Sequence, residues 1–328
     1  MKLQALIEEL ERQKPLKWDK RLKSPEIEMG LDENLPYLQV QGKKAVLITK
    51  PCHDQIAEKL EIPLKYYRKM EEEAPELLVE NVNAWLNRNA KDIFLRCLGD
   101  SARAFLSERY RIIDHLDVLY CSLNELQAHD AEIEDCYLSE TEMNIKIKSQ
   151  KLRDFIRHKD DLIFSGIFLR NSETGQRALR VEPRIFRVVC SNGMIIEELV
   201  TRAIHIGSGD EILDEIIYLS LRRSIRELFS RFGEIVQYLR ESTEIKIRNP
   251  QSVIRNVVEE YKLSEAQKAN ILMAFGAEPE YDQYGIANAI TLAAQKEETW
   301  EKSVELERIG GRLITLPPDD FKRLDEPA

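Results

Sequence analysis

The sequence is poor in the residues and motifs that mark catalytic and redox sites. Its five cysteines are widely separated and form no CxxC pair, so we expect buried free thiols rather than a disulfide framework or a zinc ribbon. Its five histidines form no HxH or i, i+4 metal pair. Its 13 glycines build no phosphate-cradling loop, and P-loop, GxGxxG, HExxH and GxSxG motifs are all missing. The sequence therefore indicates no catalytic residue, no metal and no cofactor, and it disfavours an enzyme.

Long apolar runs are also missing. No stretch approaches the roughly 18 to 20 residues that a membrane span needs. Three acidic residues, Glu8, Glu9 and Glu11, lie where a signal peptide needs an uninterrupted apolar core. We therefore expect a cytoplasmic location and no membrane partner. Hydrophobic residues make up 43% and charged residues 32% of the chain, the balance of an ordinary globular protein.

Negative charge prevails overall, but positive charge is concentrated in one stretch. The net charge of -10 argues against a protein that coats DNA by bulk electrostatics. Residues 141–190, however, hold 11 Lys/Arg and 6 Asp/Glu, a surplus of five positive charges. Two extended runs there flank a turn at 171–175, and they carry five arginines: Arg170, Arg177, Arg180, Arg184 and Arg187. Such strands could bind an anion, or their arginines could pair with acidic residues of neighbouring strands. Both interpretations remain open at this point.

The pattern of apolar residues divides the chain into three parts. Residues 1–90 are expected to be a mainly helical segment that contains a helix pair broken near Pro63. The spacing of this pair weakly resembles a helix-turn-helix, although packing helices are the favoured interpretation. Residues 91–210 are expected to form a central core. Residues 211–328 are expected to be helical, beginning with one long helix over 211–247.

The central core is predicted to be α+β. Its order is a hairpin, a helix over 115–127, several more strands, and a helical segment that ends near His205. Short turns between consecutive strands predict a central antiparallel sheet with helices on one face. The predicted strands span residues 93–98, 102–106, 133–138, 143–147, 162–170 and 179–190.

Several segments together resemble a known family. They are IAEKLEIPLKYYRKM, APELLVENVNAWL, RAFLSERYRIIDH, NSETG…VEPRIFRVVCSNGMI…IHIG and YGIANAITLAAQ, in consistent order over roughly residues 45–315. This pattern resembles the domain-of-unknown-function family of phage- and plasmid-related proteins. The resemblance implies a role in the biology of a bacterial mobile element, but it brings no agreed catalytic residues.

The order of elements from 93 to 205 is also similar to the core of single-strand annealing recombinases of the Rad52 and RecT type. That similarity implies a basic groove for a nucleic-acid backbone, with Tyr110 and Phe186 available to stack on bases. We add Arg202 and His205 because they lie close in sequence to the basic stretch. The candidate nucleic-acid-binding residues are Arg103, Arg109, Tyr110, Arg111, Lys146, Lys148, Arg180, Arg184, Phe186, Arg187, Arg202 and His205.

The leading hypothesis is a protein that binds single-stranded DNA in the recombination or replication of a mobile element. A homo-oligomer is part of this hypothesis, because annealing proteins work as rings or filaments. One alternative is an interaction factor that acts on a host or phage protein and uses its arginines in structural pairs. Another is an unrecognised metal-dependent hydrolase or nuclease.

Overall fold

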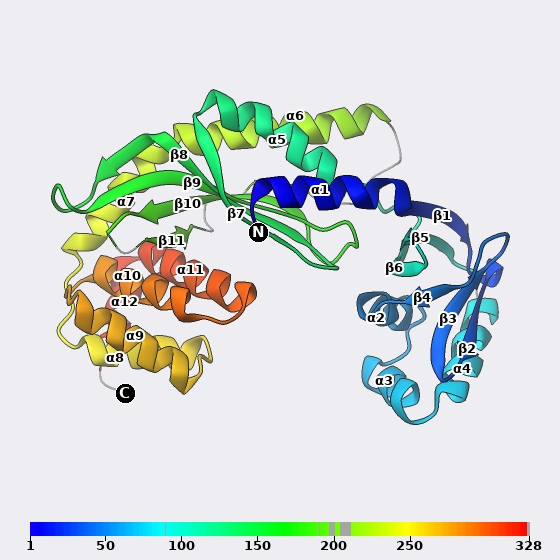
Figure 1. Cartoon of the computed structure of the whole chain (residues 1–328). Coiled ribbons are helices and arrows are strands. Elements are labelled where there is room, and N and C mark those ends of the chain that lie inside the picture. The colour runs from blue at the N-terminus through cyan, green and yellow to red at the C-terminus, as the bar shows by residue number, and fades with distance from the viewer. Residues whose placement is uncertain (89, 190, 197–200, 204–210, 327–328) are drawn as a thin grey trace.

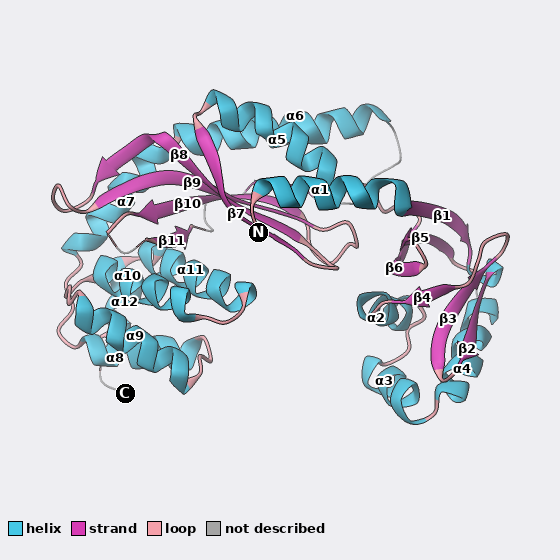
Figure 2. Cartoon of the chain, in the orientation of Figure 1, coloured by secondary structure: helices cyan, strands magenta, loops and turns pink. Residues whose placement is uncertain are grey.

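The computed structural model describes residues 1–88, 90–189, 191–196, 201–203 and 211–326, and it describes their side chains except in 201–203 and 211–214. These residues form helices and two six-stranded, mostly antiparallel sheets (Figure 2), which confirms the predicted α+β class. The outline is an arch, with one sheet at the top and two legs below it (Figure 1). Within the described residues, no helix combines the length and the apolar character needed to cross a membrane.

One leg is the N-terminal lobe, residues 17–107, a sheet with three helices packed against it. Its strand order is β1-β5-β6-β4-β3-β2, and only β4 and β6 pair in parallel. Its elements are β1 (Lys17–Lys23), β2 (Ile27–Asp32), β3 (Leu35–Val40), β4 (Val46–Ile48), α2 (Lys50–Lys59), α3 (Leu64–Glu73), α4 (Pro75–Arg88), β5 (Asp92–Leu98) and β6 (Ser101–Ser107). The predicted helix pair is α2 and α3. Its apolar side, with Ile56 and Tyr67, packs into the core of this lobe.

The top of the arch is the second sheet, with strand order β11-β10-β9-β8-β7 and β12 paired to β10. Its strands are β7 (Ala131–Leu138), β8 (Met143–Phe155), β9 (Leu162–Asn171), β10 (Leu179–Arg187), β11 (Asn192–Ile195) and β12 (Thr201–Ala203). Alternate residues such as Ile145, Leu169 and Val181 make one face apolar. That face is covered by α1 (Leu3–Gln13), α5 (His115–Ala128) and α6 (Glu211–Ser230), as Figure 1 shows.

The other leg consists of C-terminal helices, which bring a helix onto the opposite face of the second sheet. They are α7 (Phe232–Glu244), α8 (Pro250–Glu260), α9 (Glu265–Ala277), α10 (Gln283–Ala293), α11 (Trp300–Thr315) and α12 (Pro318–Leu324). Helix α11 lies against β11 at Gly311, where a Cβ atom would be only 1.9 Å from the carbonyl oxygen of Ile195. The glycine therefore permits the close approach of helix and strand. Helices thus cover both faces of the second sheet, where the sequence had suggested one.

Two predicted helices differ from the structure. The helix predicted over 211–247 is divided at Arg231 into α6 and α7. The division lets α6 pack in the same core as α5 while α7 packs in the C-terminal core. The helical prediction between residue 194 and His205 was wrong for its described residues, because Ile195 is the last residue of β11 and 201–203 form β12, and both strands satisfy backbone groups of β10. His205 itself lies outside the described residues.

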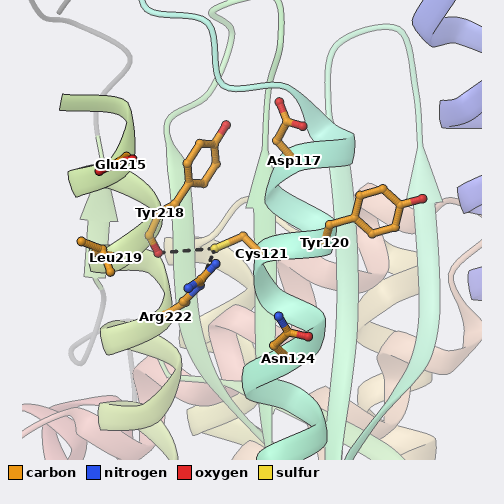
Figure 3. Close-up of a pocket in the computed structure, with 8 residues that line it drawn as sticks. All are labelled: Asp117, Tyr120, Cys121, Asn124, Glu215, Tyr218, Leu219 and Arg222. Carbon is orange, nitrogen blue, oxygen red and sulfur yellow. Dashed lines mark hydrogen bonds between the residues drawn. The ribbon is translucent and has the colours of Figure 1, made fainter. Parts of the chain in front are cut away.

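Helices α5 and α6 leave a pocket of about 580 Å³ between them, shown in Figure 3. Cys121 lies at its base, where Arg222 Nε donates a hydrogen bond to the sulfur (3.3 Å) and the thiol donates to the carbonyl oxygen of Tyr218 (3.4 Å). Burial raises the pKa of Cys121 above its ordinary value, so the thiol form is favoured. The four cysteines that the structure describes are all free and buried, as expected.

Candidate functional site

Four candidate residues lie where the N-terminal lobe meets the second sheet: Arg103, Arg109, Tyr110 and Arg111. The tip of the β9–β10 hairpin, residues 171–174, is fully buried at this junction. Arg103 donates to the carboxylate of Glu173 (3.0 Å), and Tyr110 donates to the carbonyl oxygen of Ser172 (3.2 Å). Arg111 is buried as well, and Arg109 is exposed. Arg103 and Tyr110 therefore join the two parts of the molecule, and of these four only Arg109 is exposed to solvent.

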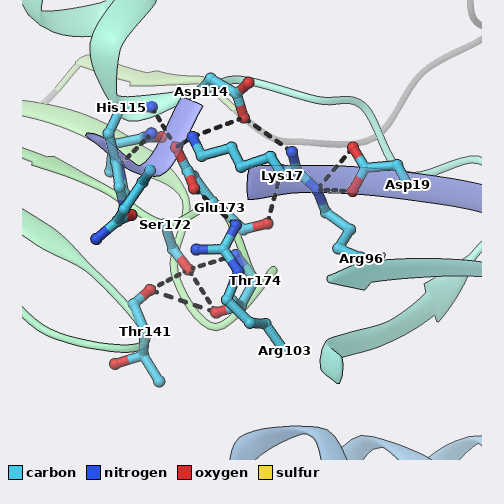
Figure 4. A network of polar contacts seen from close by, with 12 residues as sticks. Lys17, Asp19, Arg96, Arg103, Asp114, His115, Thr141, Ser172, Glu173 and Thr174 are labelled. Atoms are coloured by element: carbon cyan, nitrogen blue, oxygen red, sulfur yellow. Dashed lines mark hydrogen bonds and ion pairs between the residues drawn. The ribbon is translucent and has the colours of Figure 1, made fainter. Parts of the chain in front are cut away.

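Glu173 is the centre of a buried polar network that joins the lobe to the sheet (Figure 4). Its carboxylate accepts from Lys17 Nζ (2.6 Å), from Arg103 and from the backbone N–H of His115 (2.7 Å). Burial alone would raise the pKa of Glu173, but His115, Lys17 and Arg103 hold it well below its ordinary value. Burial lowers the pKa of His115 to about 4. At neutral pH the network thus holds a charged Glu173 and a neutral His115.

Three other candidates, Lys146, Arg184 and Arg187, are buried in ion pairs. Helix α11 places Glu307 between Lys146 (2.9 Å) and Arg184 (3.3 Å). Arg187 pairs with Asp161 and Glu278 on the far side of the sheet, each at 2.6 Å. The acidic partners come from other elements of the fold. These three cations are therefore engaged in ion pairs within the protein.

Lys148 and Phe186 lie together on the same face as Arg184. The ammonium group of Lys148 is 4.5 Å from the ring centroid of Phe186 and 5.5 Å from that of Phe164. Both Lys148 and Phe186 are half-buried. This contact is a cation–π interaction, which engages the ring with a cation of the protein itself.

Four polar residues of this face form a row across the sheet. Strand pairing places Tyr137 opposite Asn144, Asn144 opposite Arg170, and Arg170 opposite Arg180. Residues directly opposite in adjacent strands share a face. We call Tyr137, Asn144, Arg170 and Arg180 the Arg170 row. The β10–β12 pairing places Arg202 opposite Arg180 and so extends the row by one residue. Only the backbone of Arg202 is described.

The Arg170 row carries more positive than negative charge. Glu182 lies beside it, but its carboxylate accepts hydrogen bonds from both terminal nitrogens of Arg308, one of them at 2.8 Å. Arg180 reaches the same carboxylate only at 3.8 Å. Burial, followed by the like charge of Arg308, lowers the pKa of Arg170 below its ordinary value. The Nε atoms of Arg170 and Arg180 are buried and have no hydrogen-bond partner among the described residues.

An aromatic pair borders the row at its β7 end. The ring of Tyr137 stacks on Trp300 of α11, with centroids 5.5 Å apart and planes at 7°. Both rings are half-buried, and the indole nitrogen of Trp300 has no hydrogen-bond partner. Guanidinium groups and aromatic rings thus adjoin on one face, which is the combination that single-stranded nucleic-acid sites use.

Sequence reasoning included Arg180 and Arg202 among the candidates but omitted Asn144 and Arg170. The register of the β9–β10 hairpin is the signal that relates Arg170 to Arg180. It depends on the length of the connecting loop, which the sequence leaves open. Among the described side chains, no group of three or more His, Cys, Asp or Glu is placed to hold a metal ion.

The comparison with protein families decides where the chain belongs. The model of a domain of unknown function, DUF932, matches residues 104–308. The chain is a member of the DUF932 family. The comparisons with curated proteins and with solved structures found no match. The DUF932 domain contains the whole second sheet and the Arg170 row, together with Trp300, Glu307 and Arg308 of α11.

Proposed function

We propose that this DUF932 protein binds single-stranded nucleic acid, with the Arg170 row as a contact for the backbone. The observation that carries the proposal is the adjacency of Arg170 and Arg180, two guanidinium groups with little pairing to the residues that the structure describes. Guanidinium groups bind phosphate oxygens in a bidentate geometry. Of the original candidates, Arg180 stays at the centre of the proposed interface, whereas Arg103, Lys146, Arg184 and Arg187 are engaged in buried ion pairs.

Preference for a single strand follows from the aromatic rings beside the row. Trp300 is already engaged by Tyr137 and by Lys146, whose ammonium group is 4.5 Å from the ring centroid, so Tyr137 is the ring that we propose for stacking with an unpaired base. The bases of a duplex, in contrast, are already stacked on one another. Exposed Arg109 and Arg177 offer further charge near the hairpin tip. The resemblance to phage- and plasmid-related proteins suggests a role in the recombination or replication of a mobile element, and self-assembly on the strand is part of that proposal.

Fluorescence anisotropy tests the proposal directly. A labelled single strand and the matching duplex are titrated without metal at 50 mM and 200 mM salt. We expect tighter binding of the single strand and weaker binding at the higher salt, because phosphate contacts release counterions. Arg170→Ala with Arg180→Ala should reduce the slope of log affinity against log salt by about 0.7, the change expected when one phosphate shared by the two guanidinium groups is no longer neutralised.

The matched control is Arg223→Ala, which removes an exposed guanidinium from α6 on the opposite side of the second sheet. This variant should bind as the wild type does. Absence of single-strand binding at 50 mM salt would refute the proposal.

A protein-interaction factor is the second candidate function, and the pocket between α5 and α6 favours it. Tyr120 and Leu219 line this pocket and are exposed, at 43% and 59%. The buried ion pairs of Arg184 and Arg187 also agree with arginines in structural roles. Salt-insensitive capture of a host or phage protein, abolished by Leu219→Asp and kept by Arg170→Ala, would support this function.

A further inference from the structure

Arg170 and Arg180 hold unused hydrogen-bonding capacity inside the protein. Each guanidinium carries five N–H donors. Within the part of the chain that the structure describes, Arg170 makes no hydrogen bond or ion pair, and Arg180 has only the 3.8 Å contact with Glu182. The Nε atoms of both are buried. Other buried atoms of the described residues also lack a partner, among them the Nε atoms of Arg103 and Arg157, but those two arginines donate hydrogen bonds through their terminal nitrogens. Arg170 and Arg180 are neighbours and form no such hydrogen bond among the described residues, which points to a place where another molecule binds.

Asn144 adds a third unused group to the same place. Its side chain is 3% exposed and lies opposite Arg170 in the β8–β9 register. Its Oδ1 atom has no hydrogen-bond partner. Because the oxygen and nitrogen of an amide can exchange places by a flip, this side chain can present N–H donors to an anion.

The electrostatics of the Arg170 row also suit an anion. Like charges directly opposite in adjacent strands repel, and Arg170 faces Arg180 in this way. Two acids lie near Arg170, Glu182 and Glu142, and Glu182 is engaged by Arg308 in a bidentate pair. An anionic ligand with several acceptor oxygens would relieve the repulsion and satisfy the donors together.

We infer that Asn144, Arg170 and Arg180 form a phosphate-binding seat that spans strands β8, β9 and β10. The inference rests on the same row as the proposed function and deepens it, because it names phosphate itself as the bound group. Phosphate provides tetrahedral oxygens that two guanidinium forks can share, while the Asn144 amide donates from the third strand. The phosphate could belong to a nucleic-acid backbone or to a free phosphate compound.

Thermal denaturation of the full chain with inorganic pyrophosphate tests the seat, with sodium chloride at equal ionic strength as the reference. We expect the midpoint to rise by about 5 °C at saturating pyrophosphate, because a ligand that binds only the folded state stabilises it. The Arg170→Met, Arg180→Met double variant should lose this rise. No rise for the wild type would overturn the inference.

The same variants separate a ligand seat from a structural role. Removing a repelled and unpaired guanidinium should leave the midpoint without ligand unchanged or higher. Arg184→Met is the comparison variant, because it breaks the buried contacts with Glu307 and Glu134 and should lower the midpoint. A fall in the double variant as large as that in Arg184→Met would assign Arg170 and Arg180 to structure and overturn the inference.

A competition experiment distinguishes the source of the phosphate and keeps the two proposals separate. Displacement of a bound single strand by pyrophosphate would support a backbone phosphate in the seat. A pyrophosphate effect without any strand binding would support the seat for a free phosphate compound and refute the proposed function. Strand binding that neither pyrophosphate nor the double variant affects would refute the seat and leave the proposed function standing.

Discussion

Replacement of Glu173 by glutamine tests whether the buried network holds the N-terminal lobe to the second sheet. Glu173 is 1% exposed and lies at the tip of the β9–β10 hairpin. Its carboxylate accepts from two cations, Lys17 and Arg103, whose side chains are themselves 10% and 9% exposed. Glutamine keeps the shape and one acceptor oxygen, but it removes the charge that balances these two cations.

The expected cost is about 3 to 5 kcal/mol in the free energy of unfolding, the usual effect of leaving a buried charge without its partner. The hydrogen bonds support this magnitude, because each bond to a charged group contributes about 1.5 to 3 kcal/mol and Glu173 accepts several. Urea unfolding followed by circular dichroism measures the change. A second substitution, Arg103→Met, should recover part of the stability, because it removes one of the unbalanced cations.

The control is Glu72→Gln, which makes the same chemical change at an exposed position of α3. It should alter the free energy of unfolding by less than about 0.5 kcal/mol. A decrease below about 1 kcal/mol for Glu173→Gln would refute the reasoning, since it would mean that the junction does not depend on this carboxylate.

Three further substitutions test the neutral His115 of the same network, the contact of α11 with β11, and the ion pairs of Arg184. Burial lowers the pKa of His115 from 6.5 to about 4, so the unfolded chain takes up this proton first and stability falls by about 3 kcal/mol as the pH drops from 6.5 to 4. His115→Gln should remove that part of the pH dependence in thermal melts, and an unchanged profile would contradict the assignment. Gly311→Ala should cost about 2 kcal/mol through overpacking against β11; an unchanged melting temperature would show that α11 can shift. Arg184→Met should cost about 3 kcal/mol in urea unfolding, and wild-type stability would show that Lys146 alone balances Glu307.

The sequence predicted best where a strand or helix has a strong apolar pattern of its own. The strands over 93–98, 102–106 and 162–170 correspond to β5, β6 and β9, and the helix over 115–127 corresponds to α5. These strands bury most of their side chains, and their sequences are correspondingly rich in apolar residues. Strand β1 was not predicted. Its sequence, KWDKRLK, buries only Leu22 and so has no strong apolar pattern; it becomes a strand through its pairing with β5.

The roles of the arginines show the limit of the same reasoning. The sequence by itself determined the hairpin, its turn and the concentration of arginines in its strands, because turn residues and alternation act through neighbouring backbone geometry. Only the tertiary structure decided which arginines are paired. Glu307 reaches Arg184 across 123 positions of sequence. Arg170 and Arg180 face each other, and among the described residues their one acidic contact is that of Arg180 with Glu182 at 3.8 Å. Ion pairing between distant residues depends on the path of the whole chain, which a local sequence pattern does not specify.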